Sequence, residues 1–433
     1  MGTAILIIGV LIEAAFTVYC IITKSNQSKA IRFLRIGAFA AFLALTLATV
    51  IEWSFRWYAL AGLLTVWAAP AGWALIFPKE DKNGYRVGRV IGKAIGAVLL
   101  IVISLMPALV FPQIKPLKPS GAHPVQTAVY TWTDENRVET YTDTGENRKV
   151  NVTFWYPAEA EGTFPLVVFS HGANGIRTSN ETLYNELASH GYVVCSIDHP
   201  YHSMFTKDVN GKVTMIDMGY LQDLQKDDPH NHKAQSVANF QKWMGVRMGD
   251  INFVIDHILS ETGNDAAETV YRRIDPAKIG VMGHSLGGAA ALGIGRMRGD
   301  VSAVIALESA FLSDIQGVDG DQFVFTDEAY PLPVLNVYSD ATWSHLSEWA
   351  QYAENYAMLS DDNPDSFNIY IRGAGHLTLT DLALVSPFLT RLFNGQESEA
   401  DTTYCLQTIN KLTLEFFDSY LKGKGDFTAE ETW

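Results

Sequence analysis

One short stretch, residues 278–288, constrains the fold of this chain more than any other. A short apolar run from Ile279 to Met282 predicts a buried strand, and it leads directly into Gly-His-Ser-Leu-Gly with Ser285 at the centre. The small residues that follow Gly287 predict a helix. Glycine is needed on both sides of the serine because larger side chains would collide with the flanking elements. The stretch therefore predicts a nucleophile elbow, a strained turn that exposes a serine hydroxyl.

Apolar runs and helical segments alternate along most of the remaining C-terminal sequence. Strands are expected at 165–169, 192–197, 279–282, 301–307, 332–338 and 367–371, and helices at 181–190, 239–261 and 403–421. Residues 127–155 alternate apolar and polar side chains between turn signals, which predicts an antiparallel meander at one edge of a sheet. Strands alternating with helices indicate a mostly parallel sheet. Together with the elbow, they predict an α/β-hydrolase fold over residues 127–433.

The N-terminal quarter has a different composition. Four apolar stretches are long enough to cross a bilayer and predict a transmembrane helical region over residues 1–112. The expected helices cover about 3–23, 36–55, 57–77 and 90–111. Residues 1–112 carry ten Lys and Arg against four Asp and Glu, whereas the rest of the chain carries 22 against 43. This acidic excess argues against nucleic acid or an anionic membrane surface as a direct partner of the C-terminal region.

The distribution of basic residues predicts the orientation of these helices. The loops after the first and third stretches carry eight Lys and Arg, and the opposite side carries three, so both loops are expected in the cytoplasm. The proline-rich residues 113–126 then form a tether to an extracytoplasmic domain of a multi-pass cell-membrane protein. Glu13 lies in the middle of the first stretch. An intramembrane carboxylate is a functional candidate, although we favour a packing role.

A serine needs a general base to act as a nucleophile. In this fold the chain order is serine, acid, histidine, and His345 and His376 are the histidines that follow Ser285. His376 follows the last expected strand in a glycine-rich loop and is favoured as the base. Glu308 and Asp340 each end a strand between the serine and this histidine, and either could orient the imidazole.

An oxyanion hole needs two backbone N–H groups directed at the developing negative charge. Leu286, directly after the serine, is expected to supply one, and Ala173, in the turn after strand 165–169, the other. His171 is expected to stabilise that turn, since it precedes the serine in the chain. The residues expected to surround the substrate are His171, Gly172, His284, Met204 and Phe205.

Residues 198–236 form a long polar insertion, which predicts a lid or substrate-binding wall. His230 and His232, with Asp227 and Asp228, could suggest a metal site. Their spacing is a weak signal in a polar loop, and we expect neither a metal nor another cofactor.

Six motifs, in this order, resemble the platelet-activating factor acetylhydrolase family, that is, its plasma and type II enzymes. They lie at residues 165–172, 187–191, 197–199, 283–288, 305–308 and 372–376. The resemblance covers about residues 150–425 and implies a serine-dependent, calcium-independent ester hydrolase. It implies Ser285 as the nucleophile, His376 as the base, the residue at 308 as the acid, and Ala173 and Leu286 as the oxyanion donors.

Two departures from that family leave alternatives open. The family has Asp at the acid position where this chain has Glu308, and the resembling cutinases and polyester hydrolases take their acid from the later strand, here Asp340. The animal members of the family lack membrane spans. We expect a membrane-anchored serine esterase for lipid-like esters with short acyl chains. The alternatives are a cutinase-like or general carboxylesterase for soluble or polymeric esters, and a non-catalytic lipid-binding or sensing ectodomain.

Overall fold

The computed structural model describes residues 1–78, 84–159, 161–264, 268–360, 363–395 and 398–433. The chain forms two compact units. The first consists of Met1–Lys115 and Val385–Leu392, and the second of Pro116–Leu384 and Phe393–Trp433.

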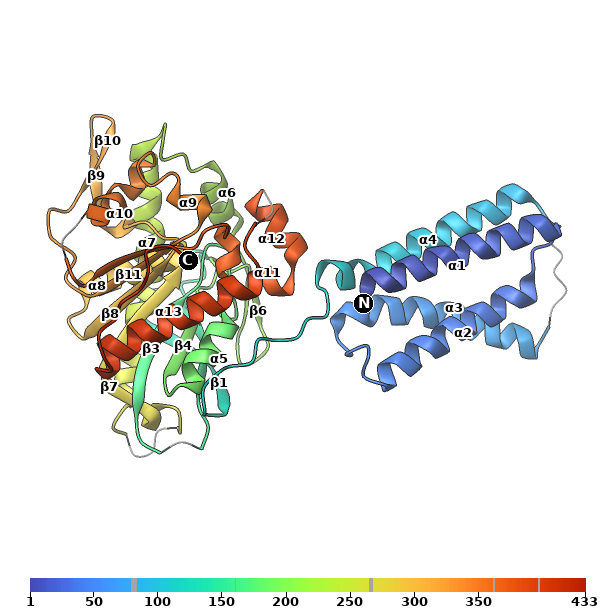
Figure 1. The fold of residues 1–433 in the computed structure, drawn as a ribbon, viewed down its shortest axis with the longest axis horizontal. Coiled ribbons are helices and arrows are strands. Elements are labelled where there is room, and N and C mark those ends of the chain that lie inside the picture. The colour runs from blue at the N-terminus through green and yellow to red at the C-terminus, as the bar shows by residue number, and fades with distance from the viewer. Residues whose placement is uncertain (79–83, 160, 265–267, 361–362, 396–397) are drawn as a thin grey trace. The chain divides into compact units, whose positions relative to one another are not determined.

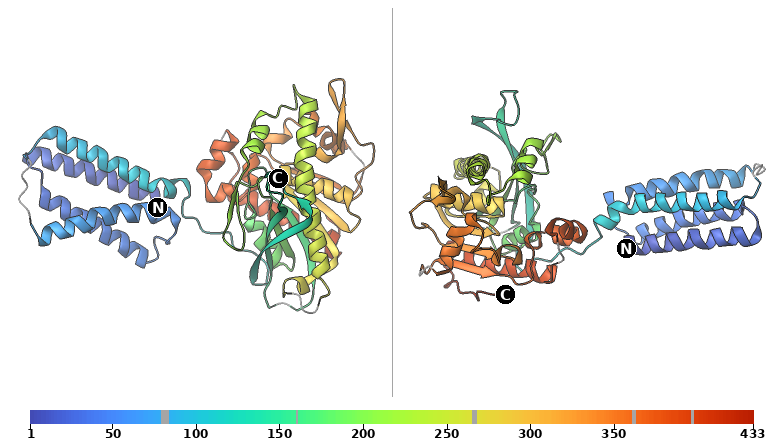
Figure 2. Two further views of the ribbon diagram at one scale, coloured as in Figure 1. Left: turned by 180° about the vertical axis from the view of Figure 1, so that it is seen from behind. Right: turned by 90° about the horizontal axis from the view of Figure 1, so that it is seen from above.

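Four long helices that lie side by side make up the body of the first unit (Figure 2). They are α1 (Gly2–Thr23), α2 (Ser28–Leu47), α3 (Tyr58–Ile76) and α4 (Val87–Val110), with a short 3-10 turn at Phe55–Trp57 before α3. All four are long and apolar enough to cross a membrane. Three of them agree with the sequence prediction to within three residues at each end.

The second helix differs from its prediction, because it begins eight residues before position 36 and ends at Leu47. Its first turns contain basic side chains that the prediction assigned to a loop. The structure shows why they fit inside a helix. The guanidinium of Arg35 pairs with Glu13 of α1 and lies 3.8 Å from the ring centre of Trp67 in α3, and Arg32 donates a hydrogen bond to the carbonyl of Ala74. Pairing makes these charges compatible with an apolar bundle.

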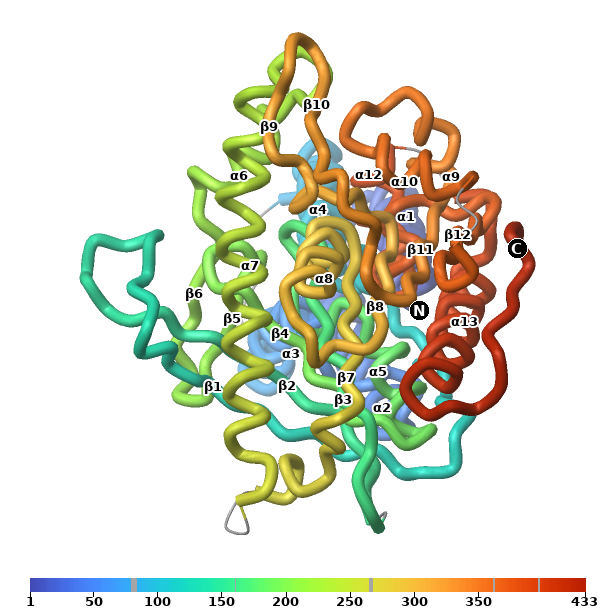
Figure 3. The backbone as a smooth tube through the Cα atoms, turned by 90° about the vertical axis from the view of Figure 1, so that its left-hand side faces the viewer, coloured from blue at the N-terminus to red at the C-terminus, as the bar shows by residue number. Residues whose placement is uncertain are grey.

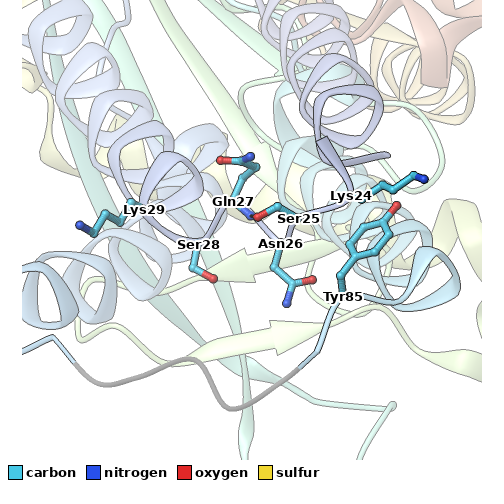
Figure 4. A pocket seen from close by; sticks show the side chains of 7 residues that line it. All are labelled: Lys24, Ser25, Asn26, Gln27, Ser28, Lys29 and Tyr85. Carbon is cyan, nitrogen blue, oxygen red and sulfur yellow. Dashed lines mark hydrogen bonds between the residues drawn. The ribbon is translucent and has the colours of Figure 1, made fainter. Parts of the chain in front are cut away.

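A cavity of about 460 Å³ lies at the loop between α1 and α2 (Figure 4). Its lining residues are Lys24, Ser25, Asn26, Gln27, Ser28, Lys29 and Tyr85. None of them belongs to the predicted catalytic constellation.

A short segment from late in the sequence also belongs to the first unit. The hydroxyl of Ser386 donates a hydrogen bond of 2.6 Å to the carbonyl of Val110, the last residue of α4. Helix α12 (Pro387–Asn394) follows, and the side chains of Phe388, Leu392 and Phe393 are each more than half exposed on it.

The second unit is built on an eight-stranded sheet in the order β1-β2-β4-β3-β7-β8-β11-β12 (Figure 1). Its strands are β1 (Val125–Val138), β2 (Asn147–Pro157), β3 (Phe164–Ser170), β4 (Val193–Asp198), β7 (Ile274–His284), β8 (Val301–Leu307), β11 (Val334–Tyr338) and β12 (Ser366–Tyr370). β1 and β2 are antiparallel, and the remaining six strands are parallel to one another. The predicted edge meander and parallel sheet are thus both present.

Helices cover both faces of this sheet, as an end-on view shows (Figure 3). Helices α7 (Lys233–Glu261) and α8 (Leu286–Met297) pack on one face, and α5 (Glu181–Ser189) and α13 (Thr402–Lys422) on the other. The central strands β3 and β4 read as continuous apolar runs because both of their faces are buried. The remaining helical segments are α6 (Met218–Lys226), α9 (Asp340–Trp343), α10 (Ala353–Ala357) and α11 (Leu382–Val385), with 3-10 turns at Tyr271–Arg273, Leu312–Asp314, Ala350–Tyr352, Met358–Ser360 and His376–Leu379.

Two small hairpins lie outside the main sheet. β5 (Phe205–Lys207) pairs with β6 (Val213–Met215) inside the predicted insertion, and β9 (Ile315–Asp319) pairs with β10 (Gln322–Phe325). The insertion is shorter than predicted, because α7 begins at Lys233 rather than at 239. The carboxylate of Asp228 accepts hydrogen bonds from Asn231 and from the His230 backbone, which closes a turn just before that helix.

Candidate active site

Ser285 occupies the turn between strand β7 and helix α8. Its backbone has φ +53° and ψ −126°, which is a strained conformation for a residue with a side chain. A Cβ on Gly283 would lie 2.4 Å from the backbone of Gly287, and a Cβ on Gly287 would lie 2.1 Å from the carbonyl oxygen of Ser170. Both positions therefore exclude a side chain. The steric reason for the flanking glycines in the sequence is present in the structure.

His376 and Glu308 come together from two different loops. Nδ1 of His376 lies 3.7 Å from Oε2 of Glu308. The carboxylate is completely buried and also accepts hydrogen bonds from the backbone N–H of Ser339 and the hydroxyl of Thr342. Burial raises the pKa of Glu308, but the neighbouring His376, with the Ser339 and Thr342 donors, outweighs it, so the pKa lies below its ordinary value. Glu308 is thus held as an anion beside the imidazole.

Asp340, the alternative acid, has other partners. Its Oδ1 accepts a hydrogen bond of 2.6 Å from the hydroxyl of Tyr370 and one of 2.8 Å from the backbone N–H of Gly373. These contacts fasten the loop that leads to His376. The structure brings Glu308, rather than Asp340, next to the histidine.

The turn after β3 lies directly against the elbow. A Cβ on Gly172 would lie 2.7 Å from Nδ1 of His284 and 3.3 Å from Cβ of Ser285. Ala173, the next residue, is partly exposed, and Leu286 begins helix α8. The two expected oxyanion donors thus come from segments that meet at the serine.

His171 and His284, both expected near the substrate and His171 also expected to stabilise its turn, contact the protein itself. Both are buried. The ring of His171 donates through Nδ1 to the carbonyl of Gly172, and the ring of His284 donates through Nε2 to the carbonyl of His376. Burial, with the neighbouring positive charges, lowers the pKa of His171 well below its usual range and that of His284 to about 3. Their neutral rings hold the two loops that flank Ser285.

Met204 and Phe205 are exposed, at 43% and 44% of their surface. They lie at the start of hairpin β5–β6, which is fastened to the turn after β3 by a hydrogen bond from the N–H of Met204 to the carbonyl of Gly175, 3.2 Å long. Two residues of the same hairpin and the helix after it, Met215 and Met218, are about 60% exposed. The insertion therefore presents apolar side chains to solvent close to the turn.

A buried polar cluster behind the turn was absent from the sequence prediction. Arg247 of α7 donates hydrogen bonds to the carbonyls of His171 and Gly172, and Asp250 of the same helix accepts a 2.9 Å hydrogen bond from His199. The sequence does contain a signal. Arg247 stands in the apolar stripe of α7, between Met244 and Ile251, where a charged residue needs a specific reason.

The strained serine turn at the carboxyl edge of a mostly parallel sheet, with the glutamate and histidine loops beside it, defines the α/β-hydrolase class. A solved structure with the same fold is the ferulic acid esterase from Streptomyces cinnamoneus. It superposes with a TM-score of 0.52 over 71% of this chain and 93% of that chain, at 22% sequence identity, and so supports the fold alone.

Residues 135–432 match the family described as platelet-activating factor acetylhydrolase, isoform II, and the chain belongs to this family. The platelet-activating factor acetylhydrolases of Canis lupus familiaris and Gallus gallus are 26% and 23% identical to it, over 63% and 61% of this chain. The matched regions span 60% and 64% of those relatives. Cutinase 1 of Thermobifida cellulosilytica is 30% identical over 36% of this chain and 43% of its own.

Proposed function

We propose that this protein is a serine hydrolase that cleaves carboxylic ester bonds in lipid-like molecules with short acyl chains. The observation that carries the proposal is that three segments meet: the strained turn at Ser285, the His376 loop, which is bonded to His284 and faces the buried Glu308 carboxylate, and the turn at Gly172. Membership of a family named for an acetylhydrolase supports the same chemistry. A binding module would need none of these three features together.

In the proposed reaction, His376 takes the proton of the Ser285 hydroxyl as its oxygen attacks the ester carbonyl. The Glu308 carboxylate stabilises the imidazolium that forms. The negative oxygen of the tetrahedral intermediate accepts hydrogen bonds from the N–H groups of Ala173 and Leu286. His376 then protonates the leaving alcohol, and a water molecule activated by the same histidine releases the acyl group from the serine.

Two features support a lipid-like substrate. The exposed apolar side chains of hairpin β5–β6 and the start of α6 lie beside the turn that carries Ala173, which suits them to cover an acyl or glycerol group. The helices of the first unit expose large apolar side chains along their length, Leu11, Val66 and Ile103 among them at 62%, 68% and 65%. Such a surface suits a lipid environment, and anchoring there raises the local concentration of amphiphilic esters.

We propose further that the four helices span the cell membrane with the second unit outside the cytoplasm. The eight Lys and Arg of residues 24–35 and 79–89, against three on the other side, support this orientation. Labelling of single cysteines in intact cells by an impermeant maleimide tests it. Reaction at Ser120→Cys with protection at Lys29→Cys is expected, and the reverse pattern would contradict the orientation.

Hydrolysis of soluble or polymeric esters is the second candidate, and the similarity to cutinase 1 favours it. The position of the acid favours the hydrolase of lipid-like esters. In the cutinase-like arrangement the acid would follow the later strand, whereas Asp340, two residues after β11, is held by Tyr370 and Gly373.

The test measures hydrolysis by the purified full chain in detergent. Substrates are p-nitrophenyl esters of two to sixteen carbons, an acetylated phospholipid in mixed micelles, and a polyester film. Ser285→Ala is compared with Ser260→Ala, which changes a serine at the exposed end of α7.

We expect activity on the short esters and on the acetylated phospholipid, lost by at least about 10³-fold in Ser285→Ala and unchanged in Ser260→Ala. Activity on the film that exceeds that on phospholipid would favour the cutinase-like candidate. A wild-type protein that hydrolyses none of the esters would overturn the enzyme and leave the lipid-binding or sensing alternative.

A further inference from the structure

Arg247 is a completely buried arginine that lies behind the Gly172 turn. Within the described residues no carboxylate forms an ion pair with it, and its Nε has no hydrogen-bond partner. Its two Nη groups instead contact oxygen atoms of three consecutive residues of the chain. Nη1 donates to the carbonyl of His171 and lies 3.4 Å from the hydroxyl of Ser170, and Nη2 donates to the carbonyl of Gly172 over 3.2 Å.

The carbonyl of Gly172 is the best-restrained oxygen in this turn. It accepts three hydrogen bonds: from Arg247, from Nδ1 of His171 at 2.7 Å, and from the N–H of Gly175 at 3.1 Å. The peptide unit is planar and trans, so the N–H of Ala173 points in the direction opposite to this carbonyl. The donors that fix the Gly172 oxygen therefore also fix the direction of the proposed oxyanion donor.

A second buried chain of hydrogen bonds supports the same turn. The hydroxyl of Ser170 lies 2.8 Å from Nε2 of His199, and Nδ1 of His199 lies 2.9 Å from a carboxylate oxygen of Asp250. Burial lowers the pKa of His199 to about 4, with Arg247 lowering it further and Asp250 opposing, so the ring is neutral. Asp250 is ionised and paired with Arg148. Ser170, His199 and Asp250 have the composition of a catalytic triad, but all three side chains are fully buried and have no access to substrate.

A buried guanidinium without a paired carboxylate is costly, and an apolar residue would suit this position in α7 better. The positive charge of Arg247 is accounted for if it acts on the turn that contains Gly172 and Ala173. Besides fixing the peptide, a positive charge on the carbonyl side polarises the Gly172–Ala173 peptide and adds positive potential where the oxyanion forms, in a region of low dielectric constant.

We propose that Arg247 is the positioning residue of the oxyanion hole: it binds the carbonyls of His171 and Gly172 and thereby directs the Ala173 N–H at the tetrahedral intermediate. This inference rests on the proposed ester hydrolysis. Arg247 itself touches no reacting atom, and its effect passes through the Gly172–Ala173 peptide.

The experiment compares Arg247→Lys and Arg247→Met with Arg148→Lys, all as full chains in detergent. Arg148 is the control because it is also a buried arginine, but it binds the carboxylate of Asp250 and does not contact the turn. A fluorophosphonate that labels the nucleophile counts the active sites, so that kcat refers only to folded protein. A short-chain trifluoromethyl ketone, which forms a tetrahedral oxyanion on the serine, reports the oxyanion hole directly.

We expect Arg247→Lys to lower kcat per labelled site about 10- to 100-fold and to raise the inhibition constant of the ketone by a similar factor, with KM changed less than about threefold. Arg148→Lys should lower kcat and weaken ketone binding much less than Arg247→Lys, because lysine keeps a positive charge beside Asp250. Arg247→Met serves if it folds, and should show the larger loss.

A fall in the number of labelled sites with unchanged kcat per site would show that Arg247 supports folding alone, and would overturn the inference. Equal losses in Arg148→Lys and Arg247→Lys would do the same. Failure of the proposed function is distinguishable, because wild type would then neither hydrolyse the esters nor bind the ketone.

Discussion

Nδ1 of His376 lies 3.7 Å from the buried carboxylate of Glu308, in a protein that offers two acids for the same role. We predict that Glu308→Gln lowers kcat about 10²- to 10⁴-fold, because the amide cannot stabilise the imidazolium. Asp340→Asn should retain activity within about tenfold. Steady-state kinetics on a short-chain ester, with both variants corrected for active sites, checks this. The reverse order of effects would move the acid to the later strand.

The second prediction concerns the close approach of Gly172 to the elbow. Gly172→Ala should lower kcat at least about tenfold, because the added Cβ would lie 2.7 Å from the His284 ring and so displace the turn. Gly317→Ala is the matched control, since a Cβ there meets nothing within 4 Å. Kinetics and thermal unfolding of both variants are to be compared. A fully active Gly172→Ala would place the oxyanion donor elsewhere.

Asp381 makes stability depend on pH. Burial raises its pKa to about 6, against the hydrogen bonds from Thr182 that lower it. The folded protein therefore binds this proton more tightly than the unfolded chain. The stabilisation is full below about pH 3.8 and is lost as pH rises through about 6, a change of about 3 kcal/mol.

We predict that Asp381→Asn flattens the dependence of the unfolding temperature on pH between 4 and 7. The exposed Asp143→Asn should keep the wild-type slope. Differential scanning fluorimetry of the full chain in detergent at several pH values measures this. An unchanged slope in Asp381→Asn would assign the dependence to other groups.

The exposed hairpin residues give a prediction about substrate choice. Met204→Ser combined with Phe205→Ser should raise KM for acetylated phospholipid several-fold and leave KM for p-nitrophenyl acetate within about twofold, since the small ester has no chain for the hairpin to cover. Val129→Ser, on the exposed edge of β1, is the control. Equal changes for both substrates would indicate a distortion of the turn instead.

Most of the fold could be predicted from the sequence because its signals are local. The apolar runs of the central strands indicate burial on both faces, and the glycines around Ser285 indicate a tight turn. The predicted α/β-hydrolase fold is confirmed. The boundaries of α2 could not be read in this way. Its basic residues are helical only because Glu13, Trp67 and the Ala74 carbonyl, all distant in sequence, receive them.

In the candidate active site, too, the features set by local sequence could be predicted, and those set by contacts between distant residues could not. Glu308 and Asp340 look equivalent in the sequence, as each is an acid at a strand end, and only the spatial partners of each distinguish them. The rings of His171 and His284, expected beside the substrate, hydrogen-bond backbone carbonyls, and for His171 this agrees with the expected stabilisation of the turn. A histidine beside a catalytic motif gives no indication of whether its ring faces the substrate or the protein interior.

The pairing of Glu13 with Arg35 bears on how the first unit is made. In the proposed membrane-spanning arrangement, either charge alone would cost about 3 kcal/mol at the centre of a helix. Because the two side chains pair across α1 and α2, the proposed arrangement would favour insertion of the two helices together as a hairpin. In that arrangement Glu13 would lack its partner until α2 has been synthesised.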